Sequence, residues 1–197
     1  MKRLFLLNIL LLFFSFSYSQ RVTSGDINCF IDITEVKVVV DYSNAIIDKL
    51  DYENRCDLDE GWVKGEKEVT ARFLKVLIGE LYRHQIKVTK KAEVSFVFHV
   101  TQIDDDGESY ANAEIIDENG NSLVAINKFH GEGGKFGSLS NLAGDGMERL
   151  ARSVGRYLDL QRNLHRSWRK KGKKEKSDSD WKQKWQEKKN KKKSEEN

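Results

Sequence analysis

An Asn-Gly pair between two alternating runs is the feature of this 197-residue sequence that most restricts its fold. Apolar and polar residues alternate over residues 110–117 and again over residues 122–129, and Asn119-Gly120 lies between these runs. Alternation indicates a strand with one buried face, and Asn-Gly is a strong hairpin signal. The sequence therefore predicts an antiparallel hairpin.

Three further strands are predicted before the hairpin, and the shortest of them is IKVT at residues 86–89. A valine-rich run over residues 34–43 alternates, and so does the run over residues 94–101. In the second run the apolar side chains would point one way and the polar ones the other: Val94, Phe96, Phe98 and Val100 against Ser95, His99 and Thr101. This pattern is typical of a half-buried strand.

Two amphipathic helices are predicted, from Glu66 to His84 and from Ser138 to Leu160, with Ser138 as an N-cap. Their apolar residues recur at three- and four-residue spacing: Val69, Phe73, Val76, Leu77 and Leu81, then Leu139, Leu142, Met147, Leu150, Val154 and Leu158. Gly79 in the first helix indicates close packing against a neighbour. Small residues in the second helix indicate tight docking on the sheet: Ala143, Gly146, Ala151 and Gly155.

From these elements we predict an α+β domain over residues 20–160. The predicted order is β-α-β-β-β-β-α, in which a twisted, mostly antiparallel sheet of four to five strands carries two helices packed on one face.

The first nineteen residues have the composition of a secretory signal peptide. Two basic residues precede an apolar run over residues 4–14, and Ser17 and Ser19 are small residues just before Gln20. The run is shorter than the roughly 20 residues of a spanning helix, which favours cleavage before Gln20 over an uncleaved anchor. We therefore predict a secreted or periplasmic bacterial protein with no transmembrane segment after cleavage.

The two cysteines, Cys29 and Cys56, are expected to form one disulfide in an oxidising compartment. Two free thiols are the alternative. Neither a CxxC motif nor a Cys/His cluster occurs, so the sequence supports neither zinc binding nor redox catalysis.

Charge is divided between two parts of the chain. Residues 161–197 hold 15 basic and 6 acidic side chains, net +9, whereas residues 20–160 hold 17 basic and 25 acidic ones, net −8. Residues 161–197, the basic tail, have few aliphatic residues and are predicted to be disordered or a lone solvated helix.

The basic tail combines tryptophans with lysines, and Trp181 and Trp185 are spaced to meet on one helix face. This combination suits an anionic lipid surface or a polyanionic envelope polymer. A purely solvating tail is the alternative, and the predicted export argues against nucleic acid as a partner. The residues expected at the surface are Trp168, Lys170, Lys171, Trp181 and Trp185.

A glycine-rich loop, containing Gly131, Gly133, Gly134 and Lys135, follows the hairpin. It lacks the hydroxyl residue that directly follows lysine in a Walker loop, and Phe136 stands where the dinucleotide pattern needs its third glycine. A structural connection is favoured. A partner-contact loop and a weak anion site at the helix N-terminus remain as alternatives.

Acidic residues and histidines offer the remaining candidate chemistry. Residues 104–108 hold four carboxylates but lack the spacing of an EF-hand, which favours an acidic turn over calcium binding. His99 with Asp105 could act as an acid–base pair, yet no motif supplies a nucleophile. A hydrolase using His99, His130 and Asp104–Asp106 is therefore kept as an alternative, and no cofactor is predicted.

Residues 34–160 resemble the small α/β domain of bacterial envelope proteins. After a valine-rich strand, the segments that carry the resemblance are EVTARFLKVLIGELYRHQIKV, AEVSFVFHVTQIDDDG and YANAEIIDENGNSLVAINKFHGEGGKFG, followed by a helix rich in small residues. The domain is similar to those of the curli secretion subunit, the lipoprotein activator of penicillin-binding proteins and the amino-terminal domain of the Tol periplasmic protein. The chain departs from them by lacking a lipobox cysteine and by bearing the basic tail.

The resemblance implies a binding or assembly role without catalysis, and it transfers no active-site residues. Together with the predicted export and the divided charge, it predicts an exported, non-enzymatic envelope domain. Such a domain would bind a protein or polymer partner and meet anionic surfaces through the basic tail. A secreted hydrolase and a calcium-binding module are the alternatives.

Overall fold

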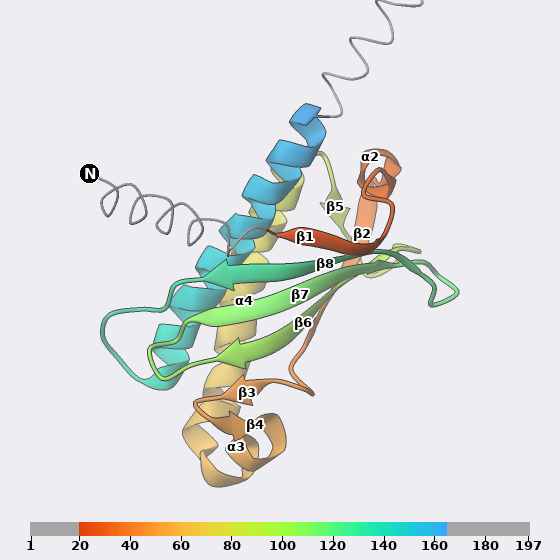
Figure 1. The fold of residues 1–197 in the computed structure, drawn as a ribbon. Helices are drawn as coiled ribbons and strands as arrows, with labels where there is room; N and C mark the ends of the chain where they lie inside the picture. Colours follow the sequence, from red (N-terminus) through yellow and green to blue (C-terminus); the bar gives the residue numbers. More distant parts are fainter. Residues whose placement is uncertain (1–19, 165–197) are drawn as a thin grey trace, which may run out of the picture. The chain divides into compact units, whose positions relative to one another are not determined.

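A computed structural model describes residues 20–164 of the chain (Figure 1). The predicted signal peptide and the five named residues of the basic tail lie outside these residues. The elements in chain order are β1 (Arg21–Gly25), α2 (Cys29–Asp32), β2 (Glu35–Asp41), β3 (Ile46–Ile47), β4 (Leu50–Asp51), α3 (Tyr52–Leu58), α4 (Glu60–Arg83), β5 (Lys87–Val88), β6 (Ser95–Ile103), β7 (Ser109–Ile116), β8 (Ser122–Gly131) and a last helix over residues 139–164.

The fold is α+β, as predicted. Eight strands form a mixed sheet in the order β1-β8-β7-β6-β2-β5, and the short pair β3–β4 joins it through β6. Figure 1 shows β1, β8, β7 and β6 side by side, with the two long helices on one face of the sheet.

The prediction of a four- to five-stranded, mostly antiparallel sheet with two helices was wrong. β2 pairs with β6 in parallel, with Lys37 opposite Ser95, and β3 and β5 also make parallel pairs. The cause is α4, which returns the chain to the starting end of β2 before the next long strand begins, so the two strands run the same way.

The elements that sequence analysis missed are short or polar. Every residue of β1 is exposed, and β1 pairs with β8 at the sheet edge without an apolar face. The short strand predicted over residues 86–89 corresponds to β5, so β5 is not among the missed elements. β3 and β4 have two residues each, and the helices α2 and α3 have four and seven. None of these segments is long enough to show a period of its own.

The predicted hairpin is confirmed as β7 and β8. Its turn is closed by hydrogen bonds from the Gly120 N–H to the Asp117 carbonyl and from the Asp117 N–H to the Asn121 carbonyl. Gly120 has a φ of 84°, a conformation that favours glycine. The side chain of Asp117 accepts hydrogen bonds from the N–H groups of Asn119 and Asn121 and so fixes the turn.

The first predicted helix begins six residues earlier than expected, at Glu60. The Asp59 side chain accepts hydrogen bonds from the N–H groups of Gly61 and Trp62, which caps the helix, and Trp62 is buried. The second helix begins at residue 139, and Ser138 accepts a hydrogen bond from the Asn141 N–H at 3.4 Å, so the predicted cap is confirmed.

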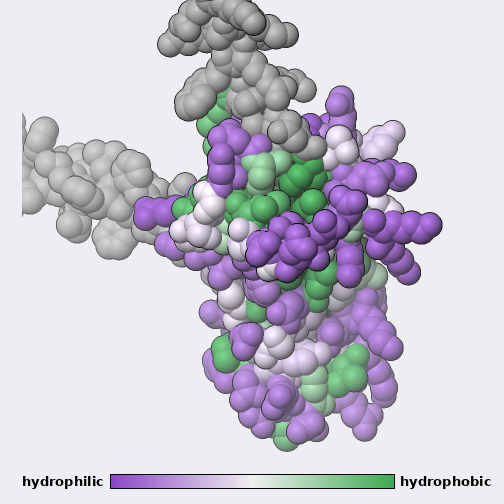
Figure 2. Space-filling view, turned by 90° about the vertical axis from the view of Figure 1, so that its right-hand side faces the viewer, coloured by the Kyte–Doolittle hydropathy of each residue, from purple (hydrophilic) through white to green (hydrophobic). Residues whose placement is uncertain are grey.

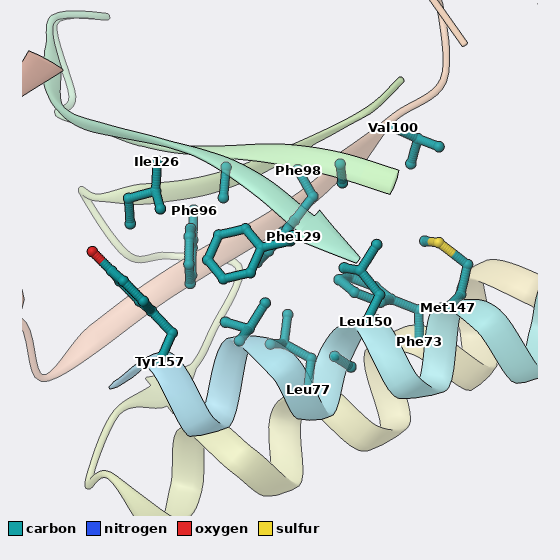
Figure 3. Packing of buried hydrophobic residues seen from close by; sticks show 14 of the residues in the cluster. Phe73, Leu77, Phe96, Phe98, Val100, Ile126, Phe129, Met147, Leu150 and Tyr157 are labelled. Carbon is teal, nitrogen blue, oxygen red and sulfur yellow. The ribbon is translucent and has the colours of Figure 1, made fainter. Parts of the chain in front are cut away.

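The core lies between the sheet and the two long helices (Figure 3). Phe96 and Phe98 of β6 and Phe129 of β8 point toward Phe73 and Leu77 of α4. From the last helix, Met147, Leu150 and Tyr157 point into the same layer. No helix among residues 20–164 combines the length and the hydropathy needed to cross a bilayer.

Candidate functional site

The outer edge of β2 is only partly covered by another strand. On its inner side, the Lys37 N–H donates to the Val94 carbonyl next to β6. Because backbone groups alternate between the two sides of a strand, those of Val38 and Val40 point outward. β5 pairs only with Glu35 and Val36, so within residues 20–164 no backbone partner covers Val38 or Val40 on that side.

A pocket of about 310 Å³ lies beside this edge. One wall comes from β2 and the residue that follows it, and the other from α4. Its lining consists of Val40, Tyr42, Glu66, Lys67, Thr70, Ala71 and Leu74. Residues 66, 67, 70, 71 and 74 lie on one helix face because they are spaced by three or four. We call this pocket, with the outer edge of β2 from Val38 to Tyr42, the edge groove.

Two stacked tyrosines fix one end of the edge groove. The rings of Tyr42 and Tyr52 lie 6.2 Å apart at 16°. The Tyr42 hydroxyl is 3.1 Å from the Thr70 hydroxyl, and the Tyr52 hydroxyl donates to Glu66 at 2.8 Å. Burial raises the pKa of Tyr42 to about 12. These bonds tie the strand end, α3 and α4 together around the pocket.

Figure 2 views the side of the molecule on which α2 and β5 lie in Figure 1. Apolar residues gather in the upper part of this side and are surrounded by hydrophilic ones. β5 forms the end of the strand order next to β2. The side that carries this sheet edge therefore has a mixed, partly apolar surface.

His99 lies on the sheet face opposite the helices, as its place in the alternation predicted. Its Nδ1 is 3.0 Å from Asp41 Oδ2, and its Nε2 is 3.6 Å from Glu114 Oε2. The predicted partner Asp105 instead pairs with Lys49 at 3.3 Å. The correction follows from the parallel register, which sets Asp41 of β2 directly opposite His99.

His130 has separate surroundings. It stacks on Tyr110, its cross-strand neighbour, with the ring centroids 4.8 Å apart. Its Nε2 is 3.7 Å from Glu108 Oε2, which also accepts a hydrogen bond from the Tyr110 hydroxyl at 2.8 Å. Each histidine therefore has its own carboxylate partners.

The acidic turn is held together by its own backbone. Asp104 Oδ1 accepts hydrogen bonds from the N–H groups of Asp106 and Glu108, at 3.1 and 2.8 Å. Within residues 20–164, no three His, Cys, Asp or Glu side chains gather as metal ligands. The turn is explained by its hydrogen bonds.

The glycine-rich loop packs against neighbouring backbone. A Cβ on Gly131 would lie 2.0 Å from the Gly146 carbonyl oxygen, and one on Gly133 would lie 1.8 Å from the Asp106 carbonyl oxygen. Arg149 donates to the carbonyls of Glu132 and Gly133. The glycines are therefore needed for close approach between the loop, the acidic turn and the last helix.

The tip of the same loop faces solvent. Lys135 is exposed, and the neighbouring Phe136 is 91% exposed. The partner-contact role predicted for Gly131, Gly133, Gly134 and Lys135 stays a prediction. Phe136 was not predicted to be an exposed contact residue. It is one of ten phenylalanines in the sequence, and phenylalanine is usually a core residue.

The predicted Cys29–Cys56 disulfide is absent, and both cysteines are free. Cys29 belongs to α2, where Phe30 packs on Phe96 near the start of β6. Cys56 belongs to α3, which follows β3–β4, and β3 pairs at the other end of β6. At about 3.3 Å per residue the strand separates these ends by roughly 20 Å, whereas a disulfide needs Cα atoms within about 7 Å.

We expect two thiols per chain when the protein is unfolded without reductant and titrated with a disulfide reagent. Burial also raises the pKa of Cys29 to about 11. At pH 8 its alkylation in the native chain should therefore be more than about 10-fold slower than in urea. Unreduced, unfolded protein without free thiols would show that the disulfide forms after all.

The carboxyl of Asp41 stabilises the fold only while it is ionised. The Ser43 N–H and hydroxyl, and then His99, hold its pKa below the usual value. Its contribution is present above about pH 4 and is lost as the pH falls through the native pKa. Since the side chain is 33% exposed, Asp41→Asn should lower the free energy of unfolding at pH 7 by only about 0.5 to 1 kcal/mol.

Urea unfolding at pH 7 and near pH 2 measures this effect, and the difference in stability between the two chains should shrink at the lower pH. Asp105→Asn is the control, because the pair of Asp105 with Lys49 is exposed on both sides. A deficit for Asp41→Asn that is as large near pH 2 as at pH 7 would contradict the assignment.

Comparisons with known proteins found structural neighbours only. No family model matches the chain, and no curated protein matches it. A PelC dodecamer from Paraburkholderia phytofirmans covers 68% of this chain and 97% of its own, at 16% identity and a TM-score of 0.32. A single-residue variant of that dodecamer in another crystal form covers 70% and 96%, at 17% identity and a TM-score of 0.35.

Proposed function

We propose that this chain is an exported, non-catalytic binding protein of the bacterial envelope. Its edge groove would hold a protein partner, and its basic tail would meet an anionic surface. The observation that carries the proposal is the outer edge of β2, where two residues present backbone groups beside a pocket. The lining of this pocket combines aliphatic side chains and a tyrosine with Thr70, Glu66 and Lys67. Backbone hydrogen-bond groups at a sheet edge are a surface to which a polypeptide can add.

Photo-crosslinking in the producing bacterium tests the groove. A photoreactive amino acid replaces Ala71, which is exposed on α4 and lines the pocket. The matched control carries it at Arg156, an exposed position of the last helix. We expect a discrete protein adduct from position 71 alone. Equal labelling from both positions, or none from either, would contradict the proposal.

The tail's role is tested separately. Recovery of membranes and polymers from envelope fractions is compared between the full chain and a chain that ends at Leu160. We expect the truncated chain to recover much less of both. Added salt should likewise lower the recovery by the full chain, because the attraction is electrostatic. Equal recovery by both chains would remove the tail from the proposal.

A hydrolase is the second candidate, because Asp41 orients the His99 imidazole as an acid–base pair requires. A hydrolase screen with the wild type and His99→Ala decides between the two functions. The binding proposal predicts no turnover that depends on His99, and clear His99-dependent turnover would favour the enzyme.

A further inference from the structure

We infer that the occupant of the edge groove is an extended segment of the partner polypeptide, which adds to β2 as a further strand. The segment would carry an aliphatic side chain toward α4 and an acidic side chain beside Lys67. This inference rests on the proposed function, since it specifies what the edge groove binds.

The backbone of β2 sets the form of the occupant. The Val36 carbonyl accepts a hydrogen bond from the Thr89 N–H at 2.9 Å, so the outward groups of β2 already pair with a strand where β5 is present. Beyond that point, Val38 and Val40 continue the same row of outward groups. Only an extended backbone offers N–H and C=O groups at the matching spacing.

The open stretch limits the length of the segment. It runs from Val38 to Tyr42, after which the chain turns, since the Ala45 N–H donates to the Tyr42 carbonyl at 2.8 Å. At about 3.3 Å per residue, these five positions accommodate a strand of four to five residues. The occupant is therefore a short segment.

The α4 wall selects an aliphatic side chain. Thr70 and Ala71 are small, and with Leu74 and Val40 they leave an open pocket of about 310 Å³ next to the strand edge. In a strand, alternate side chains point to the same face, so one residue in two of an added segment would point toward this wall. An aliphatic side chain there would bury apolar surface on both sides.

The charges at the rim favour an acidic neighbour. Glu66 keeps its negative charge, but it is half-buried and its Oε2 is directed at the Tyr52 hydroxyl. Lys67 is exposed, and within residues 20–164 it makes no ion pair. Lys67 is therefore the more accessible charge of the two, and a carboxylate on the added segment would pair with it.

The experiment uses the full chain and a synthetic array of hexapeptides as the probe. Four chains are compared: the wild type, Ala71→Trp, which fills the pocket from an exposed helix position, Lys67→Glu, and the control Arg156→Trp. We expect the selected hexapeptides to alternate aliphatic residues and to be enriched in Asp or Glu. Ala71→Trp should weaken their binding about 10-fold or more, and Arg156→Trp should leave it unchanged. Lys67→Glu should shift the selection toward basic residues.

N-methylation of the best hexapeptide tests strand addition itself. Methylating residues whose N–H faces β2 should weaken binding about 10-fold for each hydrogen bond lost, and methylating the alternate residues should have little effect. The inference is overturned if no hexapeptide prefers the wild type over Ala71→Trp, or if methylation shows no alternation. It is also overturned if Ala71→Trp dissociates a wild-type dimer in sedimentation, because the occupant is then a second copy. If either peptide experiment fails but position 71 still gives a crosslinked protein adduct, the strand-addition inference is wrong and the proposed function still holds.

Discussion

Alanine in place of Phe98 is expected to lower the free energy of unfolding by about 3 to 5 kcal/mol. The side chain is fully buried at the centre of β6, with its ring 4.4 Å from that of Phe96 and 5.0 Å from that of Phe73. Phe98 lies between the sheet and α4 (Figure 3). Its removal therefore leaves a cavity between these two elements. Urea unfolding measures the loss.

The matched control is Phe136→Ala, the same chemical change at a side chain that is 91% exposed. It should alter stability by no more than about 0.5 kcal/mol. Equal losses from the two variants would contradict the placement of Phe98 in the core and of Phe136 at the loop tip.

Gly146→Ala is expected to lower the free energy of unfolding by about 2 kcal/mol or more. A Cβ at this position would lie 2.1 Å from the Gly107 carbonyl oxygen and 2.7 Å from the Ser109 hydroxyl. The backbone carbonyl cannot rotate away as a flexible side chain could, so the last helix must move off the β6–β7 turn. This overpacking outweighs the gain of up to about 1 kcal/mol that alanine gives in a helix interior.

Gly79→Ala is the control for the gain in helix stability that comes from replacing glycine with alanine. Gly79 is exposed on α4, and a Cβ there would meet nothing within 4 Å. The change should raise stability by up to about 1 kcal/mol. If Gly146→Ala also raised stability in the same urea assay, the close contact between the last helix and Gly107 would be excluded.

The two glycines also show where sequence reasoning succeeds and fails. Both were expected to mark close packing, because glycine costs helix stability and must be compensated. Gly146 does contact a neighbour, but Gly79 faces solvent, so that part of the prediction was wrong. A glycine in a helix shows from sequence only that a side chain is absent. Whether a neighbouring element occupies that space is known only from the structure.

Elements with a local signal were predicted well. The hairpin was indicated by alternation and the Asn-Gly turn, and the two long helices by their apolar spacing. The direction of β2 relative to β6 has no local signal, because it depends on where α4 returns the chain. For the same reason the sequence assigned His99 to Asp105, six residues along the chain, when its partner is Asp41, 58 residues away.

The edge groove was not predicted for a related reason. The edge of a strand is open where the neighbouring strand is shorter than it. β5 has two residues, whereas β2 has seven. The valine-rich run indicated a strand, yet nothing in it distinguishes a central strand from one whose outer side is open.

Amide hydrogen exchange along β2 in the free chain tests the central claim most directly. If the outer edge is open, the amides of Val38 and Val40 should exchange at least about 100-fold faster than those of Val39 and Asp41, which face β6. This two-residue alternation should disappear when a partner segment binds. Equal and strong protection of all four amides in the free chain would contradict the account, since the edge would then already be covered.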